Sequence, residues 1–168
     1  MAVAAHDDGV FIYNISDIFS PQFEYIIPCE NAWTVEFIDS NHIAIGNSEH
    51  GVILTEIPCV PDSCISTSFL TLGSVKDLIS NDGLLFAAEG SGGVSVYNIA
   101  DINTPVLLDN YDTPGLSNKI ALFDSNKVAV SDWLDVKILE WNGDSLELVG
   151  YKNTGKWTMA IGAQDSII

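Results

Sequence analysis

A repeat of constant length is the feature of this sequence that most restricts its fold. Four segments align: DGVFIYNIS from Asp8, HGVILTEIP from His50, GGVSVYNIA from Gly92 and LDVKILEWN from Leu134. The valines within them, Val10, Val52, Val94 and Val136, follow one another at intervals of 42 residues. Apolar residues also recur two positions after each valine, at Ile12, Leu54, Val96 and Ile138. Such a period, carried through all 168 residues, predicts four copies of one small structural unit.

Each copy is expected to form four short antiparallel strands. In the second copy we place them at residues 33–38, 42–47, 51–57 and 66–71, because apolar residues alternate there and turn sequences separate the runs. No segment has a sustained 3.6-residue period, so we expect essentially no helix. Four antiparallel strands in about 40 residues are typical of one propeller blade. We therefore predict an all-β fold, a β-propeller with four blades of four antiparallel strands.

The two ends of the chain match complementary parts of a blade. MAVAAHDDG at the start resembles a second strand, and WTMAIGAQDSII from Trp157 resembles a first strand such as WTVEFIDSN from Trp33. Residues 157–168 are therefore expected to complete the blade begun by residues 1–28. Residues 1–168 then form either one closed four-bladed domain, or a four-blade portion of a larger ring that a second copy or further sequence completes.

The third copy, with VYNIADINTPVLLDNYDTPG, resembles the LVIVD repeat of bacterial and archaeal proteins, and the first copy is similar to it. These two copies carry an Asn-Ile-x-Asp-Ile-x-x-Pro turn, with Asp17 and Pro21 or Asp101 and Pro105. The second copy has a cysteine-containing loop there, and the fourth is shortened to WNGDS. The resemblance implies a propeller fold, often in exported or cell-surface proteins, and supplies no catalytic motif.

Charge restricts the partners that the protein can bind. The formal net charge is −17, and all six basic residues are lysines. A strongly negative surface without arginine disfavours nucleic acids and anionic lipid surfaces. No apolar run approaches the roughly 20 residues that span a bilayer, so we expect no membrane insertion. The first residues lack the pattern of a secretory signal; the extracellular or cell-surface location that we expect rests on the resemblance, and the chain could belong to a longer precursor.

Two of the three cysteines flank a short loop. Cys59 and Cys64 enclose a proline-containing segment in which a local disulfide is sterically feasible. The alternative is a pair of buried free thiols, which are common in protein cores. Neither the number nor the spacing of the cysteines matches a zinc site.

One face of the predicted propeller collects acidic and aromatic residues. In a meander, the loops between second and third strands share a face with the loops that lead into the next blade. We predict binding residues in these loops at Asp7, Asp8, Glu49, His50, Glu89, Asp132, Trp133 and Asp135. Trp133 is the expected interface anchor, because it stands in a polar reversal between acids. The alternative is that tight turns need Asp and Gly, and that the charges only solvate the loops.

The remaining aromatic and metal-ligating residues have simpler interpretations. Trp33 and Trp157 both begin a first strand and are expected to pack between blades near the axis. His6 and His50 occupy equivalent loops but lack a third ligand for zinc. We expect no cofactor; the alternative is a calcium site made by Asp7, Asp8 and neighbouring carbonyl oxygens, since hard cations take oxygen ligands.

The sequence contains no nucleophile elbow, P-loop or dinucleotide-binding motif. We therefore expect a non-enzymatic binding or scaffolding module, which holds a protein or glycan partner as part of a cell-surface or extracellular assembly and can associate with itself to complete a larger ring. The alternative is a hydrolase or lyase with acid-base carboxylates in the axial funnel, such as Asp7 with Glu49 or Asp77. This alternative rests on analogy with other propellers.

Overall fold

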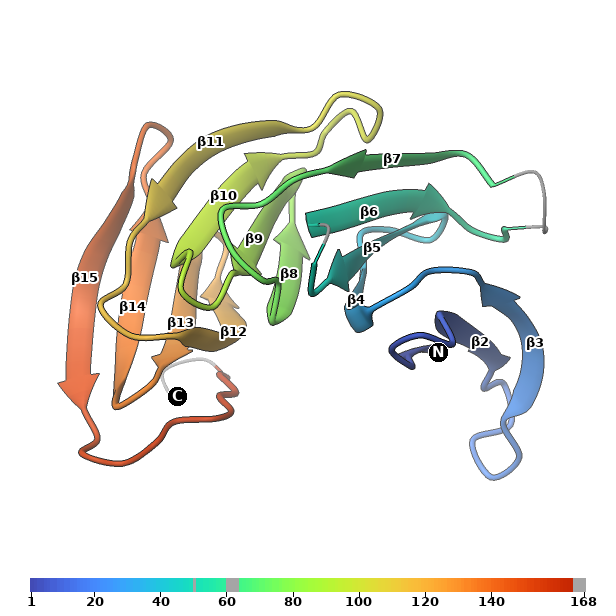
Figure 1. Cartoon of the computed structure of the whole chain (residues 1–168), viewed down its shortest axis with the longest axis horizontal. Helices are drawn as coiled ribbons and strands as arrows, with labels where there is room; N and C mark the ends of the chain where they lie inside the picture. The colour runs from blue at the N-terminus through green and yellow to red at the C-terminus, as the bar shows by residue number, and fades with distance from the viewer. Residues whose placement is uncertain (50, 60–63, 165–168) are drawn as a thin grey trace.

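The computed structural model describes residues 1–49, 51–59 and 64–164, and every regular element in these ranges is a β-strand (Figure 1). The strands form four antiparallel sheets, one for each copy of the repeat. The all-β prediction is therefore confirmed for the described part of the chain. Within the same ranges, no helix is long and apolar enough to cross a membrane.

Neighbouring strands in each sheet follow the order of the chain. The first sheet contains β1 (Ala2–Ala4), β2 (Val10–Asn14) and β3 (Gln22–Ile27). The second contains β4 (Ala32–Phe37), β5 (His42–Asn47), β6 (Gly51–Glu56) and β7 (Ser66–Phe69). The third contains β8 (Asp77–Asn81), β9 (Leu84–Ala88), β10 (Val94–Asn98) and β11 (Val106–Tyr111). The fourth contains β12 (Ser117–Asp124), β13 (Lys127–Asp132), β14 (Asp135–Trp141) and β15 (Leu146–Asn153).

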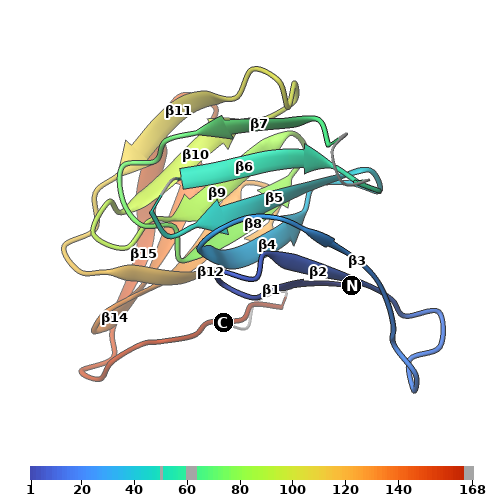
Figure 2. The same ribbon diagram turned by 45° about the vertical axis from the view of Figure 1, so that its right-hand side comes forward.

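The sheets are arranged like the blades of a fan around a common centre (Figures 1 and 2). The first strands of adjacent sheets, β4 with β8 and β8 with β12, contact each other. This is a propeller-like arrangement, as the repeat predicts. The fan is open on one side, between the first and the fourth sheet (Figure 1).

The core lies between successive sheets, in three apolar clusters. The repeated valines Val10, Val52 and Val94 are fully buried, because each faces the next sheet along the chain. Their counterpart Val136 is only half-buried, because no described sheet follows the fourth. The outer face of the fourth sheet therefore remains open.

The first sheet contains the part of a blade that residues 1–28 were expected to form, without a strand at the first position. It has three strands, and in the described ranges no strand pairs with the outer edge of β1. Residues 157–163, which were expected to occupy that edge, form no strand and lie across the opening of the fan from it (Figure 1). Residues 165–168 lie outside the described residues.

A disulfide joins Cys59 and Cys64, whose Cα atoms are 5.0 Å apart. Of the two alternatives for these cysteines, the structure therefore contains the local bridge. It closes the connection between β6 and β7, where the first and third copies have their Asp-Pro turn instead. Cys29 is a free thiol, and burial raises its pKa.

Candidate functional site

The loop face is made by the reversals between the second and third strands of the sheets. In the first three copies a glycine with positive φ precedes the repeated valine. At Gly51 and Gly93, an added Cβ would lie 2.2 and 2.3 Å from the carbonyl oxygens of Phe69 and Tyr111. The fourth copy has Asp135 at this place, and a turn at residues 133–134 joins β13 to β14. The fourth reversal thus differs in both sequence and shape.

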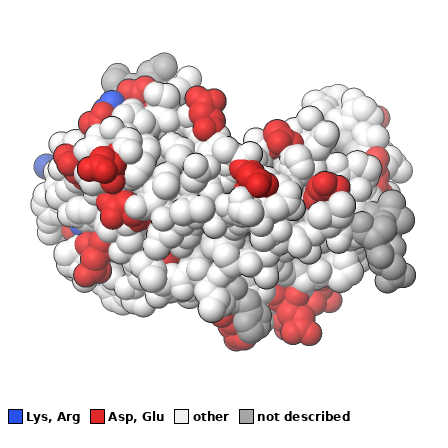
Figure 3. Space-filling model, turned by 90° about the horizontal axis from the view of Figure 1, so that it is seen from above, with Lys and Arg blue, Asp and Glu red and all other residues white. Residues whose placement is uncertain are grey.

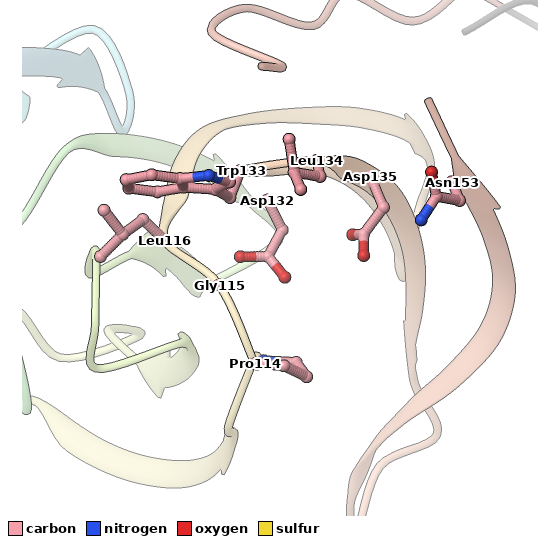
Figure 4. Close-up of a pocket in the computed structure, with 8 residues that line it drawn as sticks. All are labelled: Pro114, Gly115, Leu116, Asp132, Trp133, Leu134, Asp135 and Asn153. Atoms are coloured by element: carbon pink, nitrogen blue, oxygen red, sulfur yellow. The ribbon is translucent and has the colours of Figure 1, made fainter. Parts of the chain in front are cut away.

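A hollow of about 480 Å³ lies beside this fourth reversal (Figure 4). Its walls come from the connection that leads into β12, from the turn between β13 and β14, and from the end of β15. The lining residues are Pro114, Gly115, Leu116, Asp132, Trp133, Leu134, Asp135 and Asn153. We call this space the Trp133 hollow. In Figure 4 the carboxylates of Asp132 and Asp135 point to the same side, and Asn153 lies beyond Asp135.

A buried lysine holds the two carboxylates together. Lys137 Nζ donates to Asp132 Oδ2 and to Asp135 Oδ1, both at 2.5 Å, and the side chains of Lys137 and Asp132 are 3% and 1% exposed. Burial by itself lowers the pKa of Lys137, but the hydrogen bonds to the two aspartates outweigh it, so the pKa is raised. Two carboxylates share one ammonium group, and the cluster keeps a net negative charge.

The second oxygen of Asp132 has no partner. Among the described residues, Asp132 Oδ1 and Thr113 Oγ1 are the buried side-chain polar atoms that form no hydrogen bond. A Cβ added to Gly115 would lie 2.5 Å from Asp132 Oδ1, so only glycine lets the chain pass this close. Because buried acceptors are almost always bonded, Oδ1 is an acceptor that a donor group in the hollow can satisfy.

Trp133 forms the apolar wall of the hollow. Its φ is +50° and its side chain is 41% exposed. Its ring centroid lies 5.7 Å from that of Trp157, edge to face. A second, apolar hollow of about 210 Å³ begins on this side and is lined by Leu116, Asn118, Trp133, Trp157 and Met159. Trp133 thus separates a polar space from an apolar one, and it is accessible as an interface anchor must be.

Among the described residues, Asp7, Asp8, Glu49 and Glu89 were also predicted to bind, and none of them lines this hollow. Asp7, Asp8 and Glu49 are exposed, but they belong to the first two sheets, and Asp7 Oδ1 is 2.9 Å from His6 Nδ1. His50 lies outside the described residues. In the part of the chain that the structure describes, no three His, Cys, Asp or Glu residues come together as metal ligands.

Glu89 was expected on the exposed loop face, and that expectation is wrong. Its side chain is fully buried. Oε1 accepts a hydrogen bond from the Tyr97 hydroxyl at 2.7 Å, and Oε2 accepts one from the Leu72 amide at 2.9 Å. Burial raises the pKa of Glu89, and these hydrogen bonds oppose the increase. Glu89 therefore connects the loop before β8 to β10 of the third sheet.

The expected packing of Trp33 and Trp157 between blades is also not observed. Their side chains are 50% and 73% exposed. Lys76 Nζ lies 4.8 Å from the ring centroid of Trp33, a cation-π contact on the surface. Trp157 follows the last described strand, β15, and its ring contacts that of Trp133.

Asp77, a carboxylate of the enzymatic alternative, links the first strands of three sheets. It accepts hydrogen bonds from Thr34 Oγ1 at 3.2 Å, Lys119 Nζ at 3.0 Å and the Ile120 amide at 3.1 Å. These contacts tie β4, β8 and β12 together near the centre of the fan. The carboxylate therefore has a structural role that the sequence alone did not suggest.

Comparisons with known proteins agree with the fold and do not supply a family. No family model matches the chain, and no curated protein matches it either. Among solved structures, the chain is similar to the one described as "Structure of U3-55K", with 13% sequence identity and a TM-score of 0.68. The match covers 90% of this chain and 45% of that one, so the chain spans less than half of that protein's length. A likeness at this identity concerns the fold alone.

Proposed function

We propose that this protein is a non-enzymatic binding or scaffolding module that holds a protein or glycan partner at its loop face, with the Trp133 hollow as the contact site. The observation that supports this best is the buried, unpartnered Asp132 Oδ1 beside an exposed tryptophan. An indole ring offers a flat apolar surface for a sugar ring or a cationic side chain. The carboxylates and the Asn153 amide can then bond hydroxyl or ammonium groups.

The charge distribution favours neutral or cationic partners. Acidic side chains are scattered over the face shown in Figure 3, whereas lysines are rare on it. In the hollow itself, Lys137 compensates only part of the charge of Asp132 and Asp135. Such a field accelerates encounters with cationic protein surfaces and repels polyanions.

The disulfide supports an extracellular or cell-surface location. Disulfides persist in oxidising compartments and are rare in reducing ones. The Cys59–Cys64 bridge therefore agrees with the location implied by the LVIVD resemblance.

The test is a binding screen with two defined probe sets, an immobilised glycan array and an array of lysine- and arginine-rich peptides. We expect the protein to bind members of one set, and Trp133→Ala to weaken that binding by about tenfold or more, as for an interface anchor. The melting temperature should stay nearly unchanged, because Trp133 is partly exposed and its backbone contacts remain.

Trp33→Ala is the matched control, since Trp33 is similarly exposed but lies outside the hollow. It should leave binding intact. The proposal is wrong if neither probe set binds, or if the two tryptophan variants lose affinity equally.

A further inference from the structure

The outer edge of β1 is an unfilled position for a strand. Ala2 and Ala4 correspond, one period earlier, to Ala44 and Gly46, which pair with Glu36 and Thr34 of β4. In β1 the hydrogen bonds from Tyr13 to Met1 and from Ala5 to Gly9 face β2. Because hydrogen-bonding direction alternates along an antiparallel strand, the peptide groups of Ala2 and Ala4 face away from the sheet.

The residues after β15 make the same hydrogen bond that other parts of the chain make where they enter the first strand of the next sheet. The Thr158 amide donates to the Trp133 carbonyl at 2.7 Å. The first residues of β4 and β12 do the same: Ala32 donates to His6 and Ser117 to Gly90, both at 3.1 Å. All three acceptors have positive φ. Thr158 therefore occupies the place where a first strand begins.

The segment that follows Thr158 is exposed and apolar. With Trp157 before it, the sequence is WTMAI, which begins with the same two residues as WTVEF from Trp33. WTVEF lies in β4, where it is paired with β5. Trp157 and Met159 are 73% and 64% exposed. Apart from its chain neighbours, no described residue lies within 4 Å of the place where a Cβ of Gly162 would be. Residues 158–162 therefore have the sequence of a first strand but belong to none of the described sheets.

The two terminal sheets also present uncovered apolar faces. Tyr13 corresponds to Tyr97, two periods later, which packs against the preceding sheet and is 2% exposed. Tyr13 and Phe11 are only half-buried, and Phe23, which contacts both, is 54% exposed. On the fourth sheet, Val136 and Ile138 line an open hollow of about 370 Å³. Each end therefore lacks the neighbouring sheet that the inner sheets have.

We propose that two copies of this chain close one ring, in which residues 158–162 of each copy pair with β1 of the other. A donor strand and an acceptor edge lie at opposite ends of the same fan (Figure 1), so head-to-tail contacts between two copies satisfy both. Two copies supply eight sheets, within the range of four to eight blades usual for propellers, whereas three copies exceed it. The exposed strand edge, a site of uncontrolled association, is thereby covered.

Sedimentation of the whole chain tests this inference. We expect a particle of twice the 18.1 kDa chain mass. Ala160 lies two residues after Thr158, opposite Ala4 of the other copy, as Thr34 lies opposite Gly46. Ala160→Pro removes the amide donor of that pair and should give single chains, and Ala160→Thr, which keeps the amide, should leave the two-copy particle intact. Because Ala160 is exposed, neither change should alter the fold of one copy.

Mixing identifies the interface directly. Ala4→Pro removes the outward amide of the acceptor edge and should also give single chains. A mixture of the Ala160→Pro and Ala4→Pro chains retains one intact donor and one intact acceptor, so it should form a particle of two chains. A wild-type monomer, a larger assembly, an Ala160→Pro chain that remains paired, or a mixture that stays monomeric would each overturn the proposal.

Discussion

The third and fourth sheets place an acidic residue at the same point and use it in opposite ways. Glu89 and Asp132 each precede a residue with positive φ, Gly90 and Trp133, and each is buried. Both oxygens of Glu89 accept hydrogen bonds from the protein. Asp132 is paired with Lys137 through one oxygen only. Glu89 has a hydrogen-bond partner for each oxygen, whereas Asp132 has an oxygen that accepts no hydrogen bond from the described residues.

The difference has a cause in the connection that precedes each sheet. Leu72, whose amide donates to Glu89, corresponds one period later to Pro114, which has no N–H group. The glycine after it, Gly73 or Gly115, is present in both copies. The connection into the fourth sheet therefore resembles the connection into the third sheet in sequence, but Pro114 cannot donate a hydrogen bond to Asp132. The hydroxyl of Tyr97 is also lost, because its counterpart is Leu139, and only the Lys137 ammonium is gained. The fourth acid therefore has one partner where the third has two.

The largest expected effect comes from removing the lysine that only the fourth sheet has. Lys137→Met leaves Asp132 buried without a counter-charge, which should lower the free energy of unfolding by about 3–5 kcal/mol. Urea denaturation measures this change in the free energy of unfolding. Adding Asp132→Asn should recover much of the loss, and the exposed Lys152→Met is the control that should cost little. Equal losses for Lys137→Met and Lys152→Met would contradict the assigned role.

Glu89, whose two oxygens are both hydrogen-bonded within the protein, should instead affect how stability depends on pH. The pKa of Glu89 is raised by burial above its usual 4.5, so the folded protein holds this proton more tightly than the unfolded chain. Its contribution is therefore fully present below about pH 4.5 and is lost as the pH rises through the raised pKa. Glu89→Gln should remove this decrease.

The measurement is the difference in urea midpoint between wild type and variant across this pH range. Glu24→Gln, at an exposed carboxylate, is the control and should follow the wild-type curve. A Glu89→Gln chain that shows the same decrease as wild type would mean that another group titrates there.

The repeat made the strands and the core predictable, because a column such as Val10, Val52 and Val94 keeps its environment as long as a sheet follows. Predicted strand ends in the second copy agree with the structure to within two residues. The half-burial of Val136 was not predictable from the period, since it depends on what lies beyond the fourth sheet. The exposure of Trp157 was not predictable from the period for the same reason.

The site was predictable only in part. Asp132, Trp133 and Asp135 were identified from a polar reversal. Glu89 was misplaced because its hydrogen-bond donors, the Leu72 amide and the Tyr97 hydroxyl, come from a loop and a strand whose approach the local sequence does not show. Lys137 has a signal in the repeat itself, outside the loops. At the 42-residue spacing it aligns with Phe11, Ile53 and Ser95, and a charge in that strand column indicates a buried ion pair.

The smallest effect on stability, and the sharpest test of the comparison, comes from restoring the missing donor. Pro114→Ala gives the fourth connection an amide like that of Leu72, which can donate to Asp132 Oδ1. The new hydrogen bond should stabilise the fold by about 1 kcal/mol, and the loss of proline should offset much of this by loosening the unfolded chain. The net change in unfolding free energy should be within about 1 kcal/mol.

Binding should nevertheless weaken, because the acceptor is then occupied by the protein itself. The measurement is the affinity for whichever glycan or peptide the arrays identify, beside the urea midpoint of the same variant. Pro105→Ala, in the turn at the opposite end of β11 and outside the lining of the hollow, is the control for replacing a proline. If Pro114→Ala binds as tightly as wild type, Asp132 Oδ1 does not contact the partner, and the contrast between the two acids is one of packing alone.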